Sequence, residues 1–180
     1  MQKSSLYPSS TPDGKCVFCE IVKGAIETPG IFWEDDDCMA FLSTRPNTEW
    51  FTVVIPKNHY GSDVLAMPDD ILQQFILAAK KVSQILLSHF DDVGRVGVIM
   101  EGTGIDHAHI KLFPMHGTGH MKQGIRKQYP SDKNDYFDQY EWYIASNDGP
   151  KADPEILKRL AAKLAKISSS TWKWWASGEE

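Results

Sequence analysis

The sequence contains no apolar run long enough to span a membrane, and its first residues lack the apolar core of a signal peptide. A basic surplus is also missing, since 24 acidic residues against 19 lysines and arginines give a net charge of −5. This balance argues against a protein that binds DNA or RNA polymers through a basic face, but it permits a small anion pocket. We therefore expect a cytoplasmic protein that has neither a membrane nor a nucleic-acid polymer as its partner.

Cysteine is scarce, and an odd number of three does not suggest a disulfide framework. Cys16 and Cys19 form a C-x-x-C motif, which in a reducing compartment indicates half a zinc site or a redox pair. The plainer interpretation is two small residues packed on the first turn of a short helix over 17–23, ended by Gly24. A zinc site would need two more ligands, and because the sequence has no second C-x-x-C, histidines would have to supply them.

The length of 180 residues predicts a single domain with a sizeable core, over residues 15–180. Residues 1–14 are rich in serine, proline and glycine and predict a flexible N-terminal arm. Alternating or apolar stretches predict strands, and apolar residues at 3.6-residue spacing predict helices. The predicted strands are 31–34, 38–42, 50–55, 96–100 and 105–113, with a short one within 136–145; the predicted helices begin at Pro68 and at Asp153–Pro154; and 117–135 is predicted as an extended loop.

The predicted strand over 105–113 carries most of the candidate chemistry. Its alternation places apolar residues on one face and His107, His109 and Lys111 on the other, with neighbours on a face about 7 Å apart. Four interpretations of the second face remain open: a solvated strand face, a chelating pair for a metal, nucleophilic histidine chemistry on a phosphate with Lys111 offsetting the anionic charge, or one histidine on a metal and the other in catalysis.

The order of several motifs resembles one known family. A hairpin ends in A-F-L-S-T-R-P, a strand ends in V-V-I-P-K-N-H, and after an amphipathic helix a strand runs into M-E-G and then H-A-H-I-K-L-F-P. This arrangement is similar to the histidine triad (HIT) superfamily of nucleotide hydrolases and transferases over residues 15–116, with 117–180 as a C-terminal extension. The resemblance implies an α+β fold, in which helices pack on an antiparallel sheet that extends across a homodimer.

The resemblance also implies roles for the histidines. In the family pattern His-x-His-x-His the middle histidine is the nucleophile, which corresponds to His109, and Lys111 stands where the third histidine would be. Many members hold a zinc on a C-x-x-C, on the histidine after I-P-K-x and on the first motif histidine. The resemblance therefore implies a structural zinc with no open position, held by Cys16, Cys19, His59 and His107.

Substrate contacts are expected from two parts of the chain. The base and ribose would lie on Phe32, Phe41 and Leu42 of the hairpin, with Ser43 near the sugar, and backbone N–H groups near Gly102 and Gly104 would contact phosphate. The chain departs from the family pattern at Lys111, at Phe51 where a histidine is usual, at Ser43 where an acidic or amide residue is usual, and at Met100 where a polar residue is usual.

The function implied is that of a nucleotide hydrolase or nucleotidyl transferase, which acts at an α-phosphate through a nucleotidyl-histidine. A fixed cation at Lys111 favours an anionic polyphosphate leaving group, whereas an amine leaving group needs a general acid, so dinucleoside polyphosphates are the expected substrates. One alternative is a nucleotide-binding or zinc-stabilised interaction protein of the same fold with little turnover. A second is a metallohydrolase that uses both His107 and His109 as metal ligands.

Overall fold

The computed structural model describes residues 10–28, 30–126, 136–140, 144, 150–162 and 164. The chain divides into two compact units, residues 1–126 and 127–180, which are described separately below. The expectation of one domain over 15–180 stays a prediction. Within the described residues, no helix is long and apolar enough to cross a membrane.

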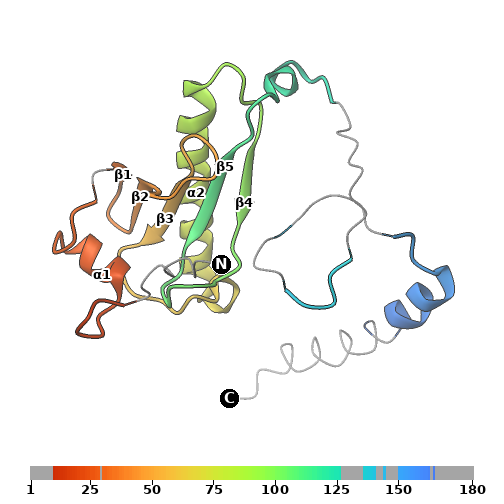
Figure 1. Cartoon of the computed structure of the whole chain (residues 1–180), viewed down its shortest axis with the longest axis horizontal. Coiled ribbons are helices and arrows are strands. Elements are labelled where there is room, and N and C mark those ends of the chain that lie inside the picture. The colour runs from red at the N-terminus through yellow and green to blue at the C-terminus, as the bar shows by residue number, and fades with distance from the viewer. Residues whose placement is uncertain are drawn as a thin grey trace, which may run out of the picture. The chain divides into compact units, whose positions relative to one another are not determined.

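The first unit is built on a five-stranded antiparallel sheet with the strand order β1-β2-β3-β5-β4 (Figure 1). This architecture confirms the predicted α+β class with an antiparallel sheet and packed helices. The hairpin of β1 and β2 is confirmed, with its turn at 35–37. The strands are β1 (Ile31–Glu34), β2 (Cys38–Leu42), β3 (Thr52–Pro56), β4 (Val96–Ile99) and β5 (Ile110–Pro114).

A long helix, α2 (Asp69–His89), covers one face of this sheet. Its buried residues Phe75, Val82 and Leu86 pack with the sheet residues whose side chains alternate toward that face. Fully burying a side chain of this size stabilises the fold by about 1.5–3 kcal/mol. The 3.6-residue spacing in the sequence also predicts Ile76 and Ile85 on the buried face of this helix, and this was wrong, since their side chains are 42% and 37% exposed. Each is next in the sequence to a buried residue, Phe75 or Leu86. Because one residue along a helix rotates the side chain by about 100°, Ile76 and Ile85 point away from the sheet.

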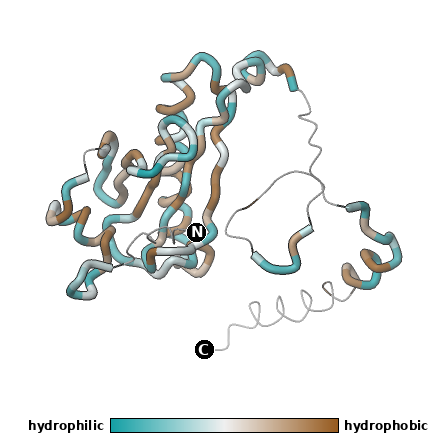
Figure 2. The backbone as a smooth tube through the Cα atoms, viewed as in Figure 1, coloured by the Kyte–Doolittle hydropathy of each residue, from teal (hydrophilic) through white to brown (hydrophobic). Residues whose placement is uncertain are grey.

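The opposite face of the sheet carries the short helix α1 (Val17–Val22). Val17, Phe18 and Ile21 of this helix form a second apolar cluster with residues of β2 and β3. The helix ends where Gly24 adopts φ 71°, a left-handed conformation that glycine accepts without steric cost. Figure 2 shows apolar residues running along β4, at one edge of the sheet.

The predicted strand over 105–113 was wrong in its first half, since β5 begins at Ile110. Residues 105–109 turn on themselves instead: the His107 N–H donates to the Ile105 carbonyl at 2.9 Å, and the Ala108 N–H donates to the Tyr60 carbonyl at 2.8 Å. Because this segment leaves the ladder, strict alternation does not hold there. His107 and His109 are 0% and 4% exposed, so the interpretation as a solvated face is wrong.

Two other segments differ from the predictions. A 3₁₀-helix, η2 (Gly119–Gln123), lies within the predicted loop over 117–135, of which residues 127–135 lie outside the described part. In the predicted N-terminal arm, residue 10 pairs with Cys16 in an isolated bridge, and the Gly14 N–H donates to the Thr11 carbonyl; residues 1–9 are not described.

The second unit contains a helix over residues 154–162. Its start agrees with the predicted one at Asp153–Pro154, and Asp153 caps the helix, because its Oδ1 accepts a hydrogen bond from the Glu155 N–H at 2.8 Å. The described residues 136–140 and 144 form no strand, and the remainder of the predicted strand at 136–145 lies outside the described part.

Candidate active site and metal centre

A cavity of about 260 Å³ lies on the α1 face of the sheet. Six of the residues expected at the site line it together: Phe41, Leu42, Ser43, Gly104, His109 and Lys111. The fold therefore gathers around one cavity the proposed nucleophile His109, the neighbouring cation Lys111 and three of the four residues expected from the hairpin and the position after it.

Two expected substrate contacts do not line this cavity. Phe32 packs against the apolar cluster on the α2 side, because an irregular register between Ile31 and Trp33 shifts the alternation of β1. Gly102 has φ 64°, and a Cβ atom there would come within 2.5 Å of the Ser62 carbonyl oxygen. The glycine is thus required by the close packing of two loops.

Several lining residues were missed by sequence reasoning. Val17, Phe18 and Ile21 bring α1 into the cavity wall, although the sequence suggested only that this helix packs. The other lining residues that were not expected are Ile26, Glu27, Thr28, Thr44, Phe51, Val53, Thr103 and Ile105. The apolar spacing of α1 was visible in the sequence, but nothing in that spacing tells a cavity wall from a core face.

His109 is held in one orientation. Its Nδ1–H donates to the backbone carbonyl of His107 at 2.8 Å, which in a neutral imidazole leaves Nε2 without a proton. Burial lowers the pKa of His109, and the positive charge of Lys111 lowers it further, against the opposite effect of that hydrogen bond. Phe18 meets the His109 ring edge-on, with centroids 5.7 Å apart. A lone pair on an aromatic nitrogen is therefore available in the wall of the cavity.

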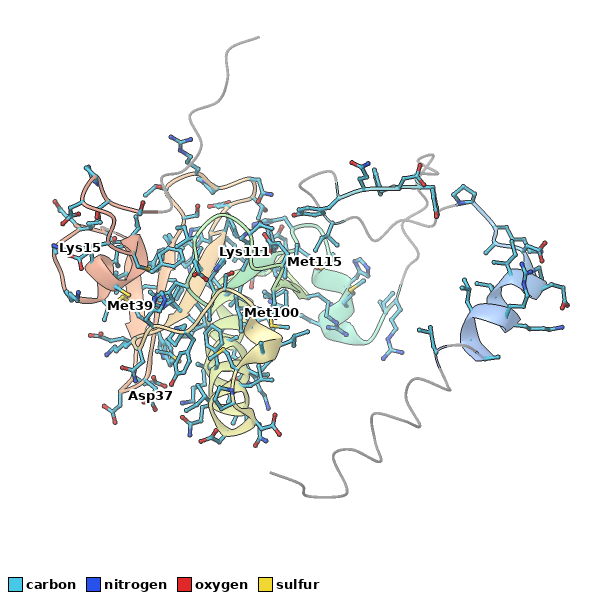
Figure 3. The ribbon with its side chains drawn as sticks, turned by 90° about the horizontal axis from the view of Figure 1, so that it is seen from below. Lys15, Asp37, Met39, Met100, Lys111 and Met115 are labelled. Carbon is cyan, nitrogen blue, oxygen red and sulfur yellow. The ribbon has the colours of Figure 1, made fainter. Side chains whose placement is uncertain are left out.

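Lys111, labelled in Figure 3, lies on β5 and lines the cavity together with His109. It forms an ion pair with Glu101, an acidic residue that was not expected at the site from the sequence. The two side chains are 23% and 13% exposed. Burial alone would raise the pKa of Glu101, but hydrogen bonds from Lys111 and Thr103 outweigh it and lower this pKa below its usual range. The cation beside His109 thus has a carboxylate partner in this state.

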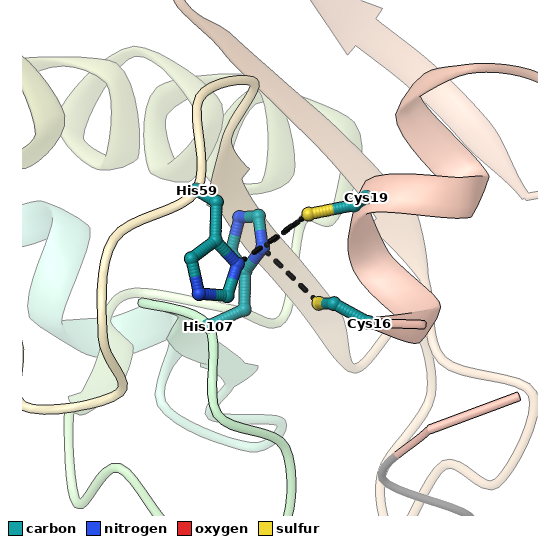
Figure 4. Close-up of side chains that lie close together, drawn as sticks. All are labelled: Cys16, Cys19, His59 and His107. Atoms are coloured by element: carbon teal, nitrogen blue, oxygen red, sulfur yellow. Dashed lines mark hydrogen bonds between the residues drawn. The ribbon is translucent and has the colours of Figure 1, made fainter. Parts of the chain in front are cut away.

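A second group of side chains includes His107, two residues before His109. Cys16, Cys19, His59 and His107 place their four potential ligand atoms within 4.8 Å of one another (Figure 4). This Cys/His cluster joins the start of α1, the loop after β3 and the segment before β5. The structure therefore brings together the four residues that the resemblance implied as a metal set, and the cluster could hold a metal ion.

The details of the Cys/His cluster suit a cation with nitrogen and sulfur ligands. His107 Nε2–H donates to the Pro56 carbonyl at 2.9 Å, so its Nδ1 carries the lone pair, and Nδ1 lies 3.4 Å from Cys16 Sγ and 3.5 Å from Cys19 Sγ. His59 Nδ1 lies 3.4 Å from Cys19 Sγ. Around a tetrahedral zinc, sulfur and nitrogen ligands would stand about 3.6 Å apart, from the usual bond lengths. A backbone carbonyl that orients the imidazole is also usual in metal sites.

Ionisation in the Cys/His cluster depends on what it binds. Burial and the adjacent Cys16 raise the pKa of the Cys19 thiol, and burial also lowers the pKa of His107. The cluster by itself thus favours a protonated Cys19 thiol and a neutral His107 imidazole, whereas a bound divalent cation would stabilise thiolate.

Comparison with known proteins decides the family. The model of the HIT domain matches residues 27–118, just over half of the chain. The chain belongs to the HIT domain family. The match contains His59, His107, His109 and Lys111 but begins after Cys16 and Cys19, so the C-x-x-C half of the Cys/His cluster lies outside it.

Individual HIT relatives agree with this assignment. Protein hit of Bacillus subtilis is 25% identical over 160 residues, which cover 87% of this chain and 96% of that protein. The adenosine 5′-monophosphoramidase of Saccharomyces cerevisiae is 28% identical over 71% of this chain and 77% of that enzyme. A crystal structure from Streptococcus mutans shares the fold, with a TM-score of 0.59, 24% identity, and coverage of 91% of this chain and 90% of that one.

Proposed function

We propose that this HIT protein is a nucleotide hydrolase or nucleotidyl transferase that acts at the α-phosphate of a nucleoside polyphosphate. The observation that carries the proposal is His109: a buried imidazole in the cavity wall whose Nδ1–H is committed to the His107 carbonyl. Such an imidazole offers Nε2 as a nucleophile of fixed orientation. The relationship to a monophosphoramidase supports the same general chemistry.

The reaction would run in two displacements. His109 Nε2 attacks the α-phosphorus, the bond from phosphorus to the leaving-group oxygen breaks, and the leaving group departs with that electron pair. Water or another acceptor then attacks the same phosphorus, the phosphorus–nitrogen bond breaks, and the nucleotide is released while the acceptor loses a proton. The apolar lining from Phe41, Leu42 and α1 would hold the base, with Ser43 near the sugar and the backbone at Gly104 near phosphate.

Lys111 supports a dinucleoside polyphosphate as the preferred substrate. An oxyanion leaving group needs no proton to depart and is stabilised by a nearby cation, whereas an amine leaving group needs a general acid. The Glu101 carboxylate offsets this cation before substrate binds, so the polyphosphate must compete with it for Lys111. A chain of several phosphates offers more anionic oxygens for that competition than a single phosphoramidate does.

We also propose that the Cys/His cluster holds a structural zinc. Two thiolates and two imidazoles would supply all four ligands of a zinc ion, which would leave no position for a substrate and favours a structural rather than a hydrolytic metal. The zinc would supply cross-linking of the N-terminal segment to the sheet. His107, one of the proposed zinc ligands, also orients His109 through its backbone carbonyl.

We further propose a homodimeric assembly and a cytoplasmic location for this protein. β4 is an edge strand, and its Val98 is 53% exposed, which supports a homodimer in which two sheets join. We propose a cytoplasmic location, where reduced cysteines are maintained. We also propose that residues 15–180 form a single HIT-like domain.

The test is covalent trapping. Purified protein is mixed with dinucleoside tetraphosphate or with a nucleoside phosphoramidate, quenched in the first turnovers, and digested for mass spectrometry. The expected result is nucleotide mass on the peptide that contains His109, and its absence in His109→Ala together with loss of turnover. Nucleotide binding without an adduct or turnover would favour the non-enzymatic alternative. Turnover that persists in His109→Ala would remove His109 as nucleophile.

A further inference from the structure

The face of β5 that opens onto the cavity continues past Lys111. Ile110, Leu112 and Pro114 are buried, whereas Lys111 and Phe113 are partly exposed, so these two share the more open face of the strand. His109 precedes them and lines the cavity with Lys111. From the residue before β5 into the strand itself, the protein therefore presents in order an imidazole, an ammonium and an aromatic ring.

Phe113 does not stand alone. Its ring stacks on that of Phe51, with centroids 4.6 Å apart and planes inclined by 14°. Phe51 lies directly before β3, lines the cavity and is itself only partly buried. On the other side, Phe113 pairs with Gly97 of β4, which has no side chain to place against the ring. The rings support each other and keep surface that is open to a ligand.

The spacing selects the kind of ligand that could reach these rings. β5 begins one residue after His109, so the backbone positions of His109 and Phe113 are separated by at most about 14 Å, the rise of four extended residues. A small leaving group bonded directly to the phosphate that His109 attacks would be too short to reach the Phe51 and Phe113 rings. A chain of phosphates with a planar group at its far end would instead pass Lys111, the cation that lies between.

We propose that Phe51 and Phe113 form a second subsite, which stacks the base of the leaving nucleotide of a dinucleoside polyphosphate. This inference rests on the proposed function, since it places the leaving group of that reaction. Aromatic rings accept any nucleobase because every base has a π-face, and stacking on such a platform changes affinity by about 5- to 150-fold. A second base would therefore be recognised by shape and stacking, without base-specific hydrogen bonds.

The experiment measures binding and does not depend on turnover. Calorimetry on the full chain carrying His109→Ala compares diadenosine tetraphosphate with adenosine tetraphosphate, which lacks only the second nucleoside. Phe51→Leu is then added, with Trp33→Leu as a matched control, because Trp33 is a partly buried aromatic residue on the α2 side of the sheet. Since the two ligands differ in terminal charge, the quantity compared between variants is the ratio of their dissociation constants.

The expected result is a 5- to 150-fold fall in the preference for the dinucleotide in Phe51→Leu, with no change in Trp33→Leu. Phe51→Tyr keeps a ring and should keep the preference, and Phe113→Leu should lower it if Phe51→Leu fails to fold. An unchanged ratio, or an equal loss for both ligands, would overturn the subsite. The subsite would also be overturned if Phe51→Leu changed only the oligomeric state, measured by gel filtration, because a second copy of the chain would then cover the rings. The subsite would stand, and the proposed function alone would be refuted, if the ratio of dissociation constants falls in Phe51→Leu as expected while the wild type forms no covalent nucleotide adduct.

Discussion

Replacement of Glu101 by glutamine should weaken the fold while strengthening anion binding. In the wild type, the Glu101 carboxylate pairs with Lys111, and its second oxygen, Oε2, is buried with no hydrogen-bond partner among the described residues. The glutamine amide would remove the charge that holds Lys111 and would place an N–H₂ group in the same confined space. Both changes act on a side chain that is only 13% exposed.

The expected loss of stability is moderate. A hydrogen bond to a charged group contributes about 1.5–3 kcal/mol, and Lys111 is 23% exposed, which allows water to replace part of the interaction. We therefore expect a loss of about 2 kcal/mol, or a fall in Tm of about 8 °C for a unit of this size. Glu34→Gln is the matched control, because Glu34 pairs with Lys57 while 57% exposed, and exposed pairs contribute about 0–1 kcal/mol.

The dependence on pH follows from the direction of the pKa. Since the pKa of folded Glu101 is lowered, its contribution is fully present above the pKa of the unfolded carboxyl and is lost as pH falls through the folded value. The difference in Tm between wild type and Glu101→Gln should therefore be constant near neutral pH and shrink below about pH 4. At neutral pH the variant should bind adenosine tetraphosphate about two- to five-fold more tightly, because Lys111 is no longer offset by a carboxylate.

Two measurements check this reasoning: thermal unfolding across pH, and calorimetric titration with the nucleotide. A Tm equal to that of wild type at neutral pH would show that the ion pair does not contribute to stability. Weaker nucleotide binding in Glu101→Gln than in Glu34→Gln would show that Glu101 positions Lys111 for the ligand and does not compete with it.

Three further predictions concern the metal, the cation and the core. Protein purified without chelator should contain one zinc per chain, and Cys16→Ser should lose it and unfold at a lower temperature; the zinc proposal fails if elemental analysis finds less than about a tenth of a zinc per chain. Lys111→His should lower the ratio of dinucleoside polyphosphate to phosphoramidate turnover, because an imidazole can protonate a departing amine; an unchanged ratio contradicts the leaving-group argument. Leu86→Ala should lower the free energy of unfolding, measured with denaturant, by about 2–5 kcal/mol, since Leu86 is fully buried against the sheet. A loss below about 1 kcal/mol would mean that α2 shifts to fill the void left by the missing side chain.

Local periodicity was sufficient to predict most of the sheet and its long helix. The hairpin of β1 and β2 and the helix α2 follow from side-chain spacing alone, because burial on one face imposes a period of 2 on strands and 3.6 on helices. The sequence also supplied the four members of the Cys/His cluster, although it did so through the order of family motifs and not through spacing. Residues so far apart as Cys16 and His107 share no local pattern.

Tertiary structure decided the features that depend on departures from regular pairing. The segment before β5 leaves the ladder, which buries both histidines and lets the His107 carbonyl orient His109. An irregular register in β1 turns Phe32 to the α2 side, away from the cavity. Such shifts cannot be read from the sequence pattern. When the register of a strand shifts by one residue, each side chain beyond the shift moves to the other face of the sheet.

The pairing of Lys111 with Glu101 and the stack of Phe51 on Phe113 were decided in the same way. In the sequence, Phe51 is a departure from a family motif and Glu101 is an acid beside a glycine. The chain alone thus determined which groups are available for chemistry. The antiparallel register determined which of these groups share one face of the sheet. Pairing of β3 and β4 with β5 brings Phe51 near Phe113, 62 positions away, and Glu101 near Lys111, 10 positions away.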